Sequence, residues 1–282
     1  MAVEAIKPYG QKGSKHEQVE AMFNHIAPTY DTLNHTLSLG VDRLWRRSAI
    51  KKIKTLSPHR GESQESRAKG QESRVESQGV KDDFKSSPSG ELERGSGVFL
   101  DVATGTGDLA IEAYKTLRPD EIIGCDISDE MMRIGRQKAA EAGLAEHIKF
   151  VHEDCEHLSF ADGTFDMVMS AFALRNFEHV GACLREMRRV MKPDGCAVII
   201  DLCAPRRFPM RQVFWLYQHT IMPLLGRILS NDQQAYSYLP RTMAAVAQGE
   251  EMVAKFHEAG FLHVEYKYLA FDMCCMYCAS KV

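Results

Sequence analysis

Short apolar runs alternate with segments of helical periodicity in the part of the chain that follows residue 97. An apolar run at 98–102 leads into a glycine turn and a helical pattern, and the same strand-turn-helix order then repeats. Parallel strands need helical crossovers between them, so this order predicts a doubly wound, Rossmann-like α/β sheet. The expected strands are Val98–Val102, Glu121–Cys125, Ile148–His152, Phe165–Ser170, Cys196–Leu202, Leu262–Leu269 and Met273–Ala279.

The last two of these strands are separated by only three residues. A parallel crossover needs a dozen or more residues, so one of the two strands must run antiparallel. The fold prediction is therefore a seven-stranded, mostly parallel sheet with one antiparallel strand. The sequence Lys192-Pro-Asp-Gly195 is expected to end the helix that precedes the strand at 196–202.

The chain before residue 57 is helical in pattern. Apolar residues at helical spacing predict a first helix that ends at Pro28, and Leu44–Ile53 predicts a second one. We interpret residues 1–56 as an N-terminal helical cap, which forms one folded domain with a core at 98–282. Residues 57–97 hold only five apolar residues. Such a segment cannot offset its ordering entropy, so it is expected to be disordered, with a partner-binding tail as the alternative.

Composition and charge narrow the class of protein. The chain has 282 residues, of which 44% are hydrophobic and 26% charged, enough for a sizeable globular core. Its net charge of -3 gives no overall cationic surface, and we expect no nucleic-acid partner. Neither a secretory leader nor an apolar run of about 18 residues is recognisable, which favours a cytoplasmic protein with reduced cysteines. Cys274, Cys275 and Cys278 are interpreted as small apolar residues of a strand.

The candidate chemistry begins at the turn Gly105-x-Gly107-x-x-Ala110, which lies between the first strand and a helix. Glycines let the backbone approach a ligand closely, and a helix N-terminus favours a negative group. Asp126 follows about twenty residues later, at the end of the second strand, where it can accept two ribose hydroxyls. The turn predicts a ribose-bearing ligand; the alternative is an ordinary strand-helix turn with a surface aspartate.

Two further acidic positions favour S-adenosylmethionine over a nicotinamide dinucleotide. Asp101 precedes the glycine turn, where it would repel a pyrophosphate and attract a ligand with ammonium and sulfonium charges. Asp154 follows the third strand, where it can accept an adenine amino hydrogen or, alternatively, cap a helix. A nicotinamide-dependent reductase is the competing enzyme class.

Several stretches of the chain resemble known proteins. DVATGTGDLA, DIS-x-x-MM, FDMVMSAFALRN and RVMKPDG are similar to motifs of class I S-adenosylmethionine-dependent methyltransferases. FNHIAPTYDTLNHTLSLGVDRLWRR, FALRN and YSYLP are more specific and resemble the menaquinone/ubiquinone-biosynthesis C-methyltransferase family. The resemblance extends from about Val19 to Val282 and is interrupted by the polar insertion.

The resemblance implies methyl transfer to a ring carbon of a demethylated prenyl quinol, with demethylmenaquinol favoured. A ubiquinone-pathway benzoquinol is one alternative, and a non-catalytic module that binds S-adenosylmethionine is another. The chain departs from the family at Ala171, where a serine is common, and at Ala173, where a glycine is common. The residues expected to bind S-adenosylmethionine are Asp101, Gly105, Thr106, Gly107, Asp126, Asp154 and Cys155.

The expected catalytic residues are Arg175 and Asn176, at the end of the fourth strand, and Tyr30 from the N-terminal region, beside Asp31. Arginine is too basic to accept a proton, so Arg175 is expected to stabilise a phenolate or to orient water. The alternative for Arg175 and Asn176 is a surface turn, and the alternative for Tyr30 is packing in the core.

No metal cofactor is expected. One polar cluster follows the third strand, but alternate residues of a strand end point apart and no second ligand group lies nearby in the sequence. The cluster consists of His152, Asp154, Cys155 and His157.

An apolar helical stripe occupies 206–229. Such a stripe is typical of core packing, but it could also line an entry for a polyprenyl tail, with the nearby arginines toward anionic lipid headgroups. A lipid quinol substrate implies transient contact with the inner face of the cytoplasmic membrane, and a homodimer is compatible with the resemblance. The stripe holds Met210, Val213, Phe214, Tyr217, Ile221, Leu224 and Ile228, and the arginines are Arg206, Arg207 and Arg211.

Overall fold

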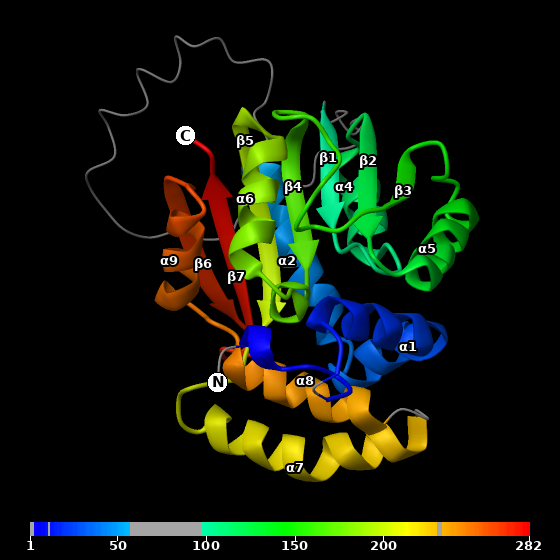
Figure 1. Cartoon of the computed structure of the whole chain (residues 1–282), viewed down its shortest axis with the longest axis vertical. Helices are drawn as coiled ribbons and strands as arrows, with labels where there is room; N and C mark the ends of the chain where they lie inside the picture. The colour runs from blue at the N-terminus through cyan, green and yellow to red at the C-terminus, as the bar shows by residue number, and fades with distance from the viewer. Residues whose placement is uncertain (1–2, 11, 57–96, 230–232) are drawn as a thin grey trace, which may run out of the picture.

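A computed structural model describes residues 3–10, 12–56, 97–229 and 233–282. Its centre is a seven-stranded sheet in the order β3-β2-β1-β4-β5-β7-β6 (Figure 1). β7 runs antiparallel to β5 and β6, and the other neighbouring strands pair in parallel, which confirms the predicted sheet. The strands are β1 (Val98–Val102), β2 (Glu121–Asp126), β3 (Ile148–His152), β4 (Phe165–Ala171), β5 (Met191–Leu202), β6 (His263–Leu269) and β7 (Cys274–Ser280).

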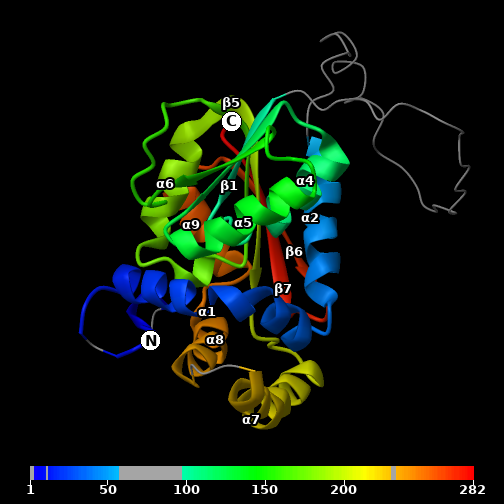
Figure 2. The same ribbon diagram turned by 90° about the vertical axis from the view of Figure 1, so that its right-hand side faces the viewer.

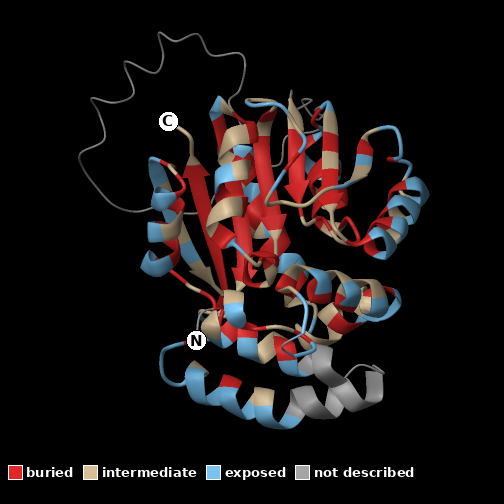
Figure 3. Cartoon of the chain, viewed as in Figure 1, coloured by how far each residue is buried: buried red, intermediate tan, exposed pale blue. Residues whose placement is uncertain are grey.

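Helices cover both faces of the sheet (Figure 2). Two of them, α6 and α9, share one apolar core with the sheet, and α2, α4 and α5 share the other. The buried residues follow the strands and these inner helix faces (Figure 3). The helices are η1 (Val3–Ala5), α1 (Lys15–Leu37), α2 (Val41–Leu56), α4 (Asp108–Leu117), α5 (Asp129–Glu141), η2 (Leu174–Asn176), α6 (Val180–Val190), α7 (Met210–Leu229), α8 (Gln233–Ala245) and α9 (Glu250–Glu258).

The N-terminal helices take two different places. α1 lies with α7 and α8 across the carboxyl ends of the parallel strands, whereas α2 packs on the sheet beside α4 (Figure 1). Residues 57–96, for which disorder is expected, lie outside the described residues. The division into 1–56, 57–97 and 98–282 therefore stays a prediction. In the described part of the chain, none of the helices has the length and hydrophobicity that crossing a membrane requires.

Pro28 does not end the first helix, so that prediction is wrong. α1 begins with a capping box between Ser14 and Glu17 and continues through Pro28 to residue 37. A proline inside a helix removes one backbone hydrogen bond and costs about 3 kcal/mol. Pro28 is exposed, while Ala27 and Leu33 are buried in the same helix. Burial of that apolar side outweighs the local cost of the proline.

The fifth strand begins earlier than predicted. Helix α6 ends at Val190, just before the Lys-Pro-Asp-Gly signal, and β5 starts directly at Met191. The pairing register shifts between Phe165 and Met167 of β4, so that 192–195 form an irregularity within the ladder. A proline is tolerated at such a bulge because its missing N–H is not needed there.

The cysteines of β7 are buried, as expected for small apolar side chains. Cys275 belongs to the core on the α6 side, whereas Cys274 and Cys278 belong to the core on the α2 side. Burial raises the pKa of the Cys278 thiol to about 11, so that it stays protonated at neutral pH.

Candidate active site

The glycine turn lies at the carboxyl end of β1, as predicted. Gly105 and Gly107 have φ angles of 54° and 75°, a region that favours glycine. A Cβ atom on Gly107 would lie 2.8 Å from Cζ of Phe150, so a larger residue would displace that ring. Gly107 precedes the first turn of α4, whose free N–H groups can approach a ligand.

Asp126 lies directly against this turn. Its Oδ2 accepts a hydrogen bond of 2.8 Å from the backbone N–H of Gly105, and its Oδ1 accepts one of 2.9 Å from Ser128. Burial raises the pKa of Asp126, and these backbone bonds oppose that shift. A carboxylate has about four acceptor positions, so acceptor capacity remains for ribose hydroxyls.

Asp101 is buried at the end of β1, with 1% of its surface exposed. Its Oδ2 accepts a 2.7 Å hydrogen bond from Thr104, whereas its Oδ1 has no partner among the described residues. Burial raises the pKa of Asp101 to about 7, and the charge of Asp126 adds to the effect. The residues present thus fit S-adenosylmethionine, because a positively charged ligand group would compensate the buried carboxyl.

The raised pKa of Asp101 gives a testable pH dependence. Between its usual 3.8 and about 7, the folded protein keeps a proton that the unfolded chain has lost, so stability falls as the pH rises through this window. Binding of a cationic ligand favours the ionised form. We expect the affinity for S-adenosylmethionine, measured by calorimetry, to rise from about pH 6 to about pH 8. Asp101→Asn should flatten this rise; an unchanged profile in the variant would contradict the assignment.

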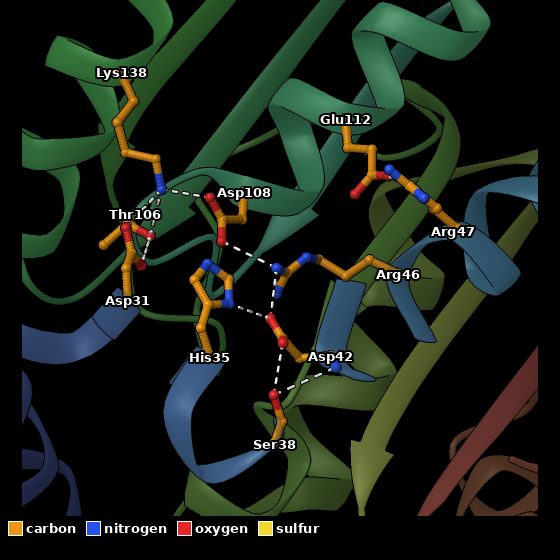
Figure 4. Close-up of polar contacts among 10 residues, drawn as sticks. All are labelled: Asp31, His35, Ser38, Asp42, Arg46, Arg47, Thr106, Asp108, Glu112 and Lys138. Carbon is orange, nitrogen blue, oxygen red and sulfur yellow. Dashed lines mark hydrogen bonds and ion pairs between the residues drawn. The ribbon is translucent and has the colours of Figure 1, made fainter. Parts of the chain in front are cut away.

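A polar network joins the N-terminal helices to the glycine turn (Figure 4). Thr106 donates a 2.7 Å hydrogen bond to Asp31 of α1. Lys138 of α5 lies 2.7 Å from Asp31 and also contacts Asp108, the first residue of α4. Thr106 is predicted to contact S-adenosylmethionine. In the structure its hydroxyl links α1 to the glycine turn.

The same network continues into α2. The guanidinium of Arg46 lies 3.1 Å from Asp108 and 2.8 Å from Asp42. His35 and Ser38 contact the same Asp42 carboxylate at 2.9 and 2.6 Å (Figure 4). Residues from α1, α2, α4 and α5 thus hold one another around the turn, and the sequence pattern gave no sign of this arrangement.

Arg175 is held by a partner that sequence reasoning missed. Its guanidinium pairs with the buried carboxylate of Asp201 at the end of β5, and its backbone N–H donates to the same carboxylate at 2.8 Å. Phe172 supplies a carbonyl at 2.6 Å. Arg175 is 7% exposed, so it is not part of a surface turn. The ion pair fixes its orientation and leaves its Nε without a partner in the described structure.

Lys15 of α1 secures the segment that carries Arg175. Its ammonium is buried and donates to the backbone carbonyls of Val3, Arg175 and Phe177 at 2.9, 3.0 and 3.0 Å. Burial lowers the pKa of Lys15 to about 8. Lys15 therefore ties both the N-terminal segment and α1 to the segment that carries Arg175.

Tyr30 and Asn176 line an apolar pocket between α1 and α8, and Arg175 lines it too. Tyr30 also borders the pocket at the glycine turn, and so does Asn34. The ring of Tyr30 packs edge-on against Phe23, with the ring centroids 5.8 Å apart. Tyr30 therefore packs in the core and also lies between the two pockets. Burial raises the pKa of Tyr30, which keeps its hydroxyl a hydrogen-bond donor. The three predicted catalytic residues are therefore brought together.

Asp154 and Cys155 follow β3. Asp154 is partly exposed, and its carboxylate accepts a hydrogen bond from the backbone of Glu156 at 2.9 Å, in the manner of a capping residue. The thiol of Cys155 points to Cys183 in the core, with the two sulfur atoms 2.7 Å apart. Neither side chain bonds to the glycine turn in the described structure, so their contacts to S-adenosylmethionine stay predictions. Within the described ranges, no three His, Cys, Asp or Glu residues converge as metal ligands.

The sheet order and the glycine turn together are those of class I S-adenosylmethionine-dependent methyltransferases. A solved methyltransferase of Thermotoga maritima, described as a possible histamine N-methyltransferase, shares this fold with a TM-score of 0.55. The two are 14% identical, and the match covers 94% of this chain and 100% of that one. The chain belongs to the ubiE/COQ5 methyltransferase family, whose model matches residues 11–65 and 80–281.

Two relatives illustrate the family. A demethylmenaquinone methyltransferase of Bacteroides fragilis is 45% identical over 278 residues, which are 99% of this chain and 98% of that protein. A ubiquinone/menaquinone biosynthesis C-methyltransferase of Geotalea daltonii is 33% identical over 268 residues, 95% and 97% of the two chains. The resemblance stated from the motifs is thereby confirmed.

Proposed function

We propose that the protein transfers a methyl group from S-adenosylmethionine to a ring carbon of demethylmenaquinol. One observation carries the proposal: the pocket at the glycine turn and the apolar pocket between α1 and α8 share Tyr30 and Asn34. A charged methyl donor at the turn would therefore lie beside an apolar aromatic substrate. The similarity to a demethylmenaquinone methyltransferase over 99% of the chain supports the naphthoquinol substrate.

The chain's own residues supply orientation and electrostatics. S-adenosylmethionine, when bound, provides a methyl group that its sulfonium charge has already activated. Asp126 would hold the ribose, and Asp101 would hold the ammonium group. Arg175, which Asp201 fixes in place, would stabilise negative charge on a ring oxygen, and Tyr30 would donate a hydrogen bond there. Such positioning is the main requirement of an in-line displacement.

The decisive experiment gives the purified protein labelled S-adenosylmethionine and each of two reduced substrates, a 2-prenyl-1,4-naphthoquinol and a demethylated prenyl benzoquinol. Mass spectrometry is expected to show one added methyl on the naphthoquinol ring. A methyl on the benzoquinol alone would favour the ubiquinone-pathway alternative. Binding of S-adenosylhomocysteine without any product would favour a binding module, and tight binding of NADH alone would favour a reductase.

We also propose that the first half of α7 contacts a membrane surface from the cytoplasmic side. Phe208, which precedes α7, and Val213, Trp215 and Leu216 of α7 are between 54% and 81% exposed, whereas Phe214 of the helix is buried. Phe214 and Tyr217 line an apolar pocket that also reaches Arg175. The predicted stripe is thus divided: one side of the helix lines a pocket and the other is exposed, and the side chains from residue 221 to 229 lie outside the described ones. Arg207 and Arg211 are exposed nearby and suit anionic headgroups, whereas the exposed Arg206 pairs with Glu251 at 3.1 Å.

The double variant Phe208→Ser/Trp215→Ser tests this contact. Burying each aromatic side chain in lipid contributes about 1.5–3 kcal/mol, so co-sedimentation with phosphatidylglycerol vesicles should fall more than about tenfold. Leu262→Ser is the matched control, because Leu262 is 61% exposed and precedes β6, away from α7. Equal vesicle binding by the double variant and the unmodified protein would argue against the contact.

A further inference from the structure

Two apolar pockets meet around Arg175. The first lies between α2, α7 and α8 and includes Trp45 and Phe214; the second lies between α1 and α8 and includes Met22 and Tyr238. Arg175 lines both pockets, together with Asn34, Leu37 and Leu239. A flat, largely apolar ligand in either pocket would therefore lie beside the guanidinium of Arg175.

The walls of these pockets carry hydrogen-bond donors without partners. The hydroxyl of Tyr238, the Nε of Arg175 and the Nε1 of Trp45 are buried and bond to none of the described residues. Tyr238 is only 2% exposed and Trp45 only 4%. Buried polar groups are satisfied in more than about nine cases in ten, so three such groups on residues that line these two adjoining pockets need an explanation. A ligand whose oxygens accept hydrogen bonds would provide it.

We propose that Tyr238 is a substrate-binding residue whose hydroxyl donates a hydrogen bond to an oxygen of the quinol ring beside Arg175. This inference rests on the proposed function and adds a residue of α8 to the substrate site. α8 packs directly against η2, the 3-10 helix that contains Arg175 and Asn176. Tyr238 belongs to the YSYLP motif, which lies outside both the glycine turn and the Arg-Asn pair.

The chemistry of Tyr238 suits a donor rather than a base. Burial raises the pKa of its hydroxyl, so that the group stays protonated at neutral pH. The positive charge of Arg175 lies close enough to oppose part of this shift. A ring oxygen between the two would accept a hydrogen bond from Tyr238 while the guanidinium balances any negative charge on it.

The test is Tyr238→Phe, measured with ligands that differ by one oxygen. Binding of a 2-prenyl-1,4-naphthoquinol should weaken about five- to tenfold, with the affinity for S-adenosylhomocysteine unchanged. Two prenyl naphthols each lack one of the two ring oxygens. The variant should bind one of them as tightly as the unmodified protein does, because that naphthol lacks the oxygen that Tyr238 would contact. If Tyr238 had a purely structural role, the variant would bind the naphthoquinol and both naphthols less tightly, and by the same factor.

Tyr277→Phe provides the matched control. Tyr277 is also 2% exposed, but its hydroxyl accepts a 3.0 Å hydrogen bond from the backbone of Gly249, and it lines neither of the two pockets. Its loss should lower the melting temperature and leave quinol affinity unchanged, whereas Tyr238→Phe should leave the melting temperature equal or higher. Unchanged quinol affinity in Tyr238→Phe would overturn the inference while the proposed function stands. If the unmodified protein neither binds nor methylates a naphthoquinol, the proposed function fails first and the inference with it.

Discussion

Replacing Asp201 by alanine is expected to lower the free energy of unfolding by about 3–5 kcal/mol, the largest loss expected of any single substitution discussed for this chain. Asp201 and Arg175 have side chains that are 4% and 8% exposed, so the variant would leave a guanidinium buried without its counter-charge. Chemical denaturation monitored by circular dichroism measures the loss. Methyl transfer should fall with it, because Arg175 would no longer be held in one orientation.

Two further variants separate the ion pair's role in stability from its role in activity. Asp162 pairs with Arg189 on the surface and is 78% exposed, so Asp162→Ala should cost less than about 1 kcal/mol. In the double variant Arg175→Met/Asp201→Leu, apolar side chains replace both charges and should recover most of the stability. Methyl transfer should stay lost in the double variant. Full activity there would show that the guanidinium has no part in the reaction.

The features that the sequence predicted well depend on local patterns. The carboxyl ends of the strands, the helix beginning at Asp129 and the turn at Gly105 follow from side-chain period, capping residues and glycine's access to positive φ. The approach of Asp126 to this turn was predictable too, because adjacent parallel strands end at the same edge of the sheet. The local rule that a proline ends a helix failed at Pro28, because the packing of α1 outweighs the cost of the proline.

The parts of the site that could not be predicted depend on contacts between distant segments. Lys15 reaches carbonyls about 160 residues further along the chain, and no periodicity encodes that contact. The pairing of Arg175 with Asp201 joins the segments that follow β4 and end β5, although an acid at the end of an apolar strand was a usable signal. Tyr238 comes from α8, which the sequence pattern did not connect with the glycine turn. The contact of Cys155 with S-adenosylmethionine stays a prediction, and its thiol points into the core.

The second large effect concerns Asp126→Ala, which should weaken the binding of S-adenosylhomocysteine by at least about 100-fold. The variant removes the acceptor for two ribose hydroxyls and also the two backbone hydrogen bonds that tie Gly105 and Ser128 to the end of β2. Hydrogen bonds to a charged group contribute about 1.5–3 kcal/mol each, so the loss of two ligand contacts is sufficient for this change. Isothermal titration calorimetry measures it directly.

Asp129→Ala is the control for this variant, because Asp129 begins the helix that follows Asp126 and is 73% exposed. It should bind S-adenosylhomocysteine as the unmodified protein does. Asp126→Asn keeps one acceptor oxygen, which can still bond either Gly105 or a ribose hydroxyl. Its affinity for S-adenosylhomocysteine should therefore lie between those of Asp126→Ala and Asp129→Ala. Should Asp126→Ala retain full affinity, the ribose would have to lie elsewhere, and the glycine turn would be no more than the structural link between β1 and α4.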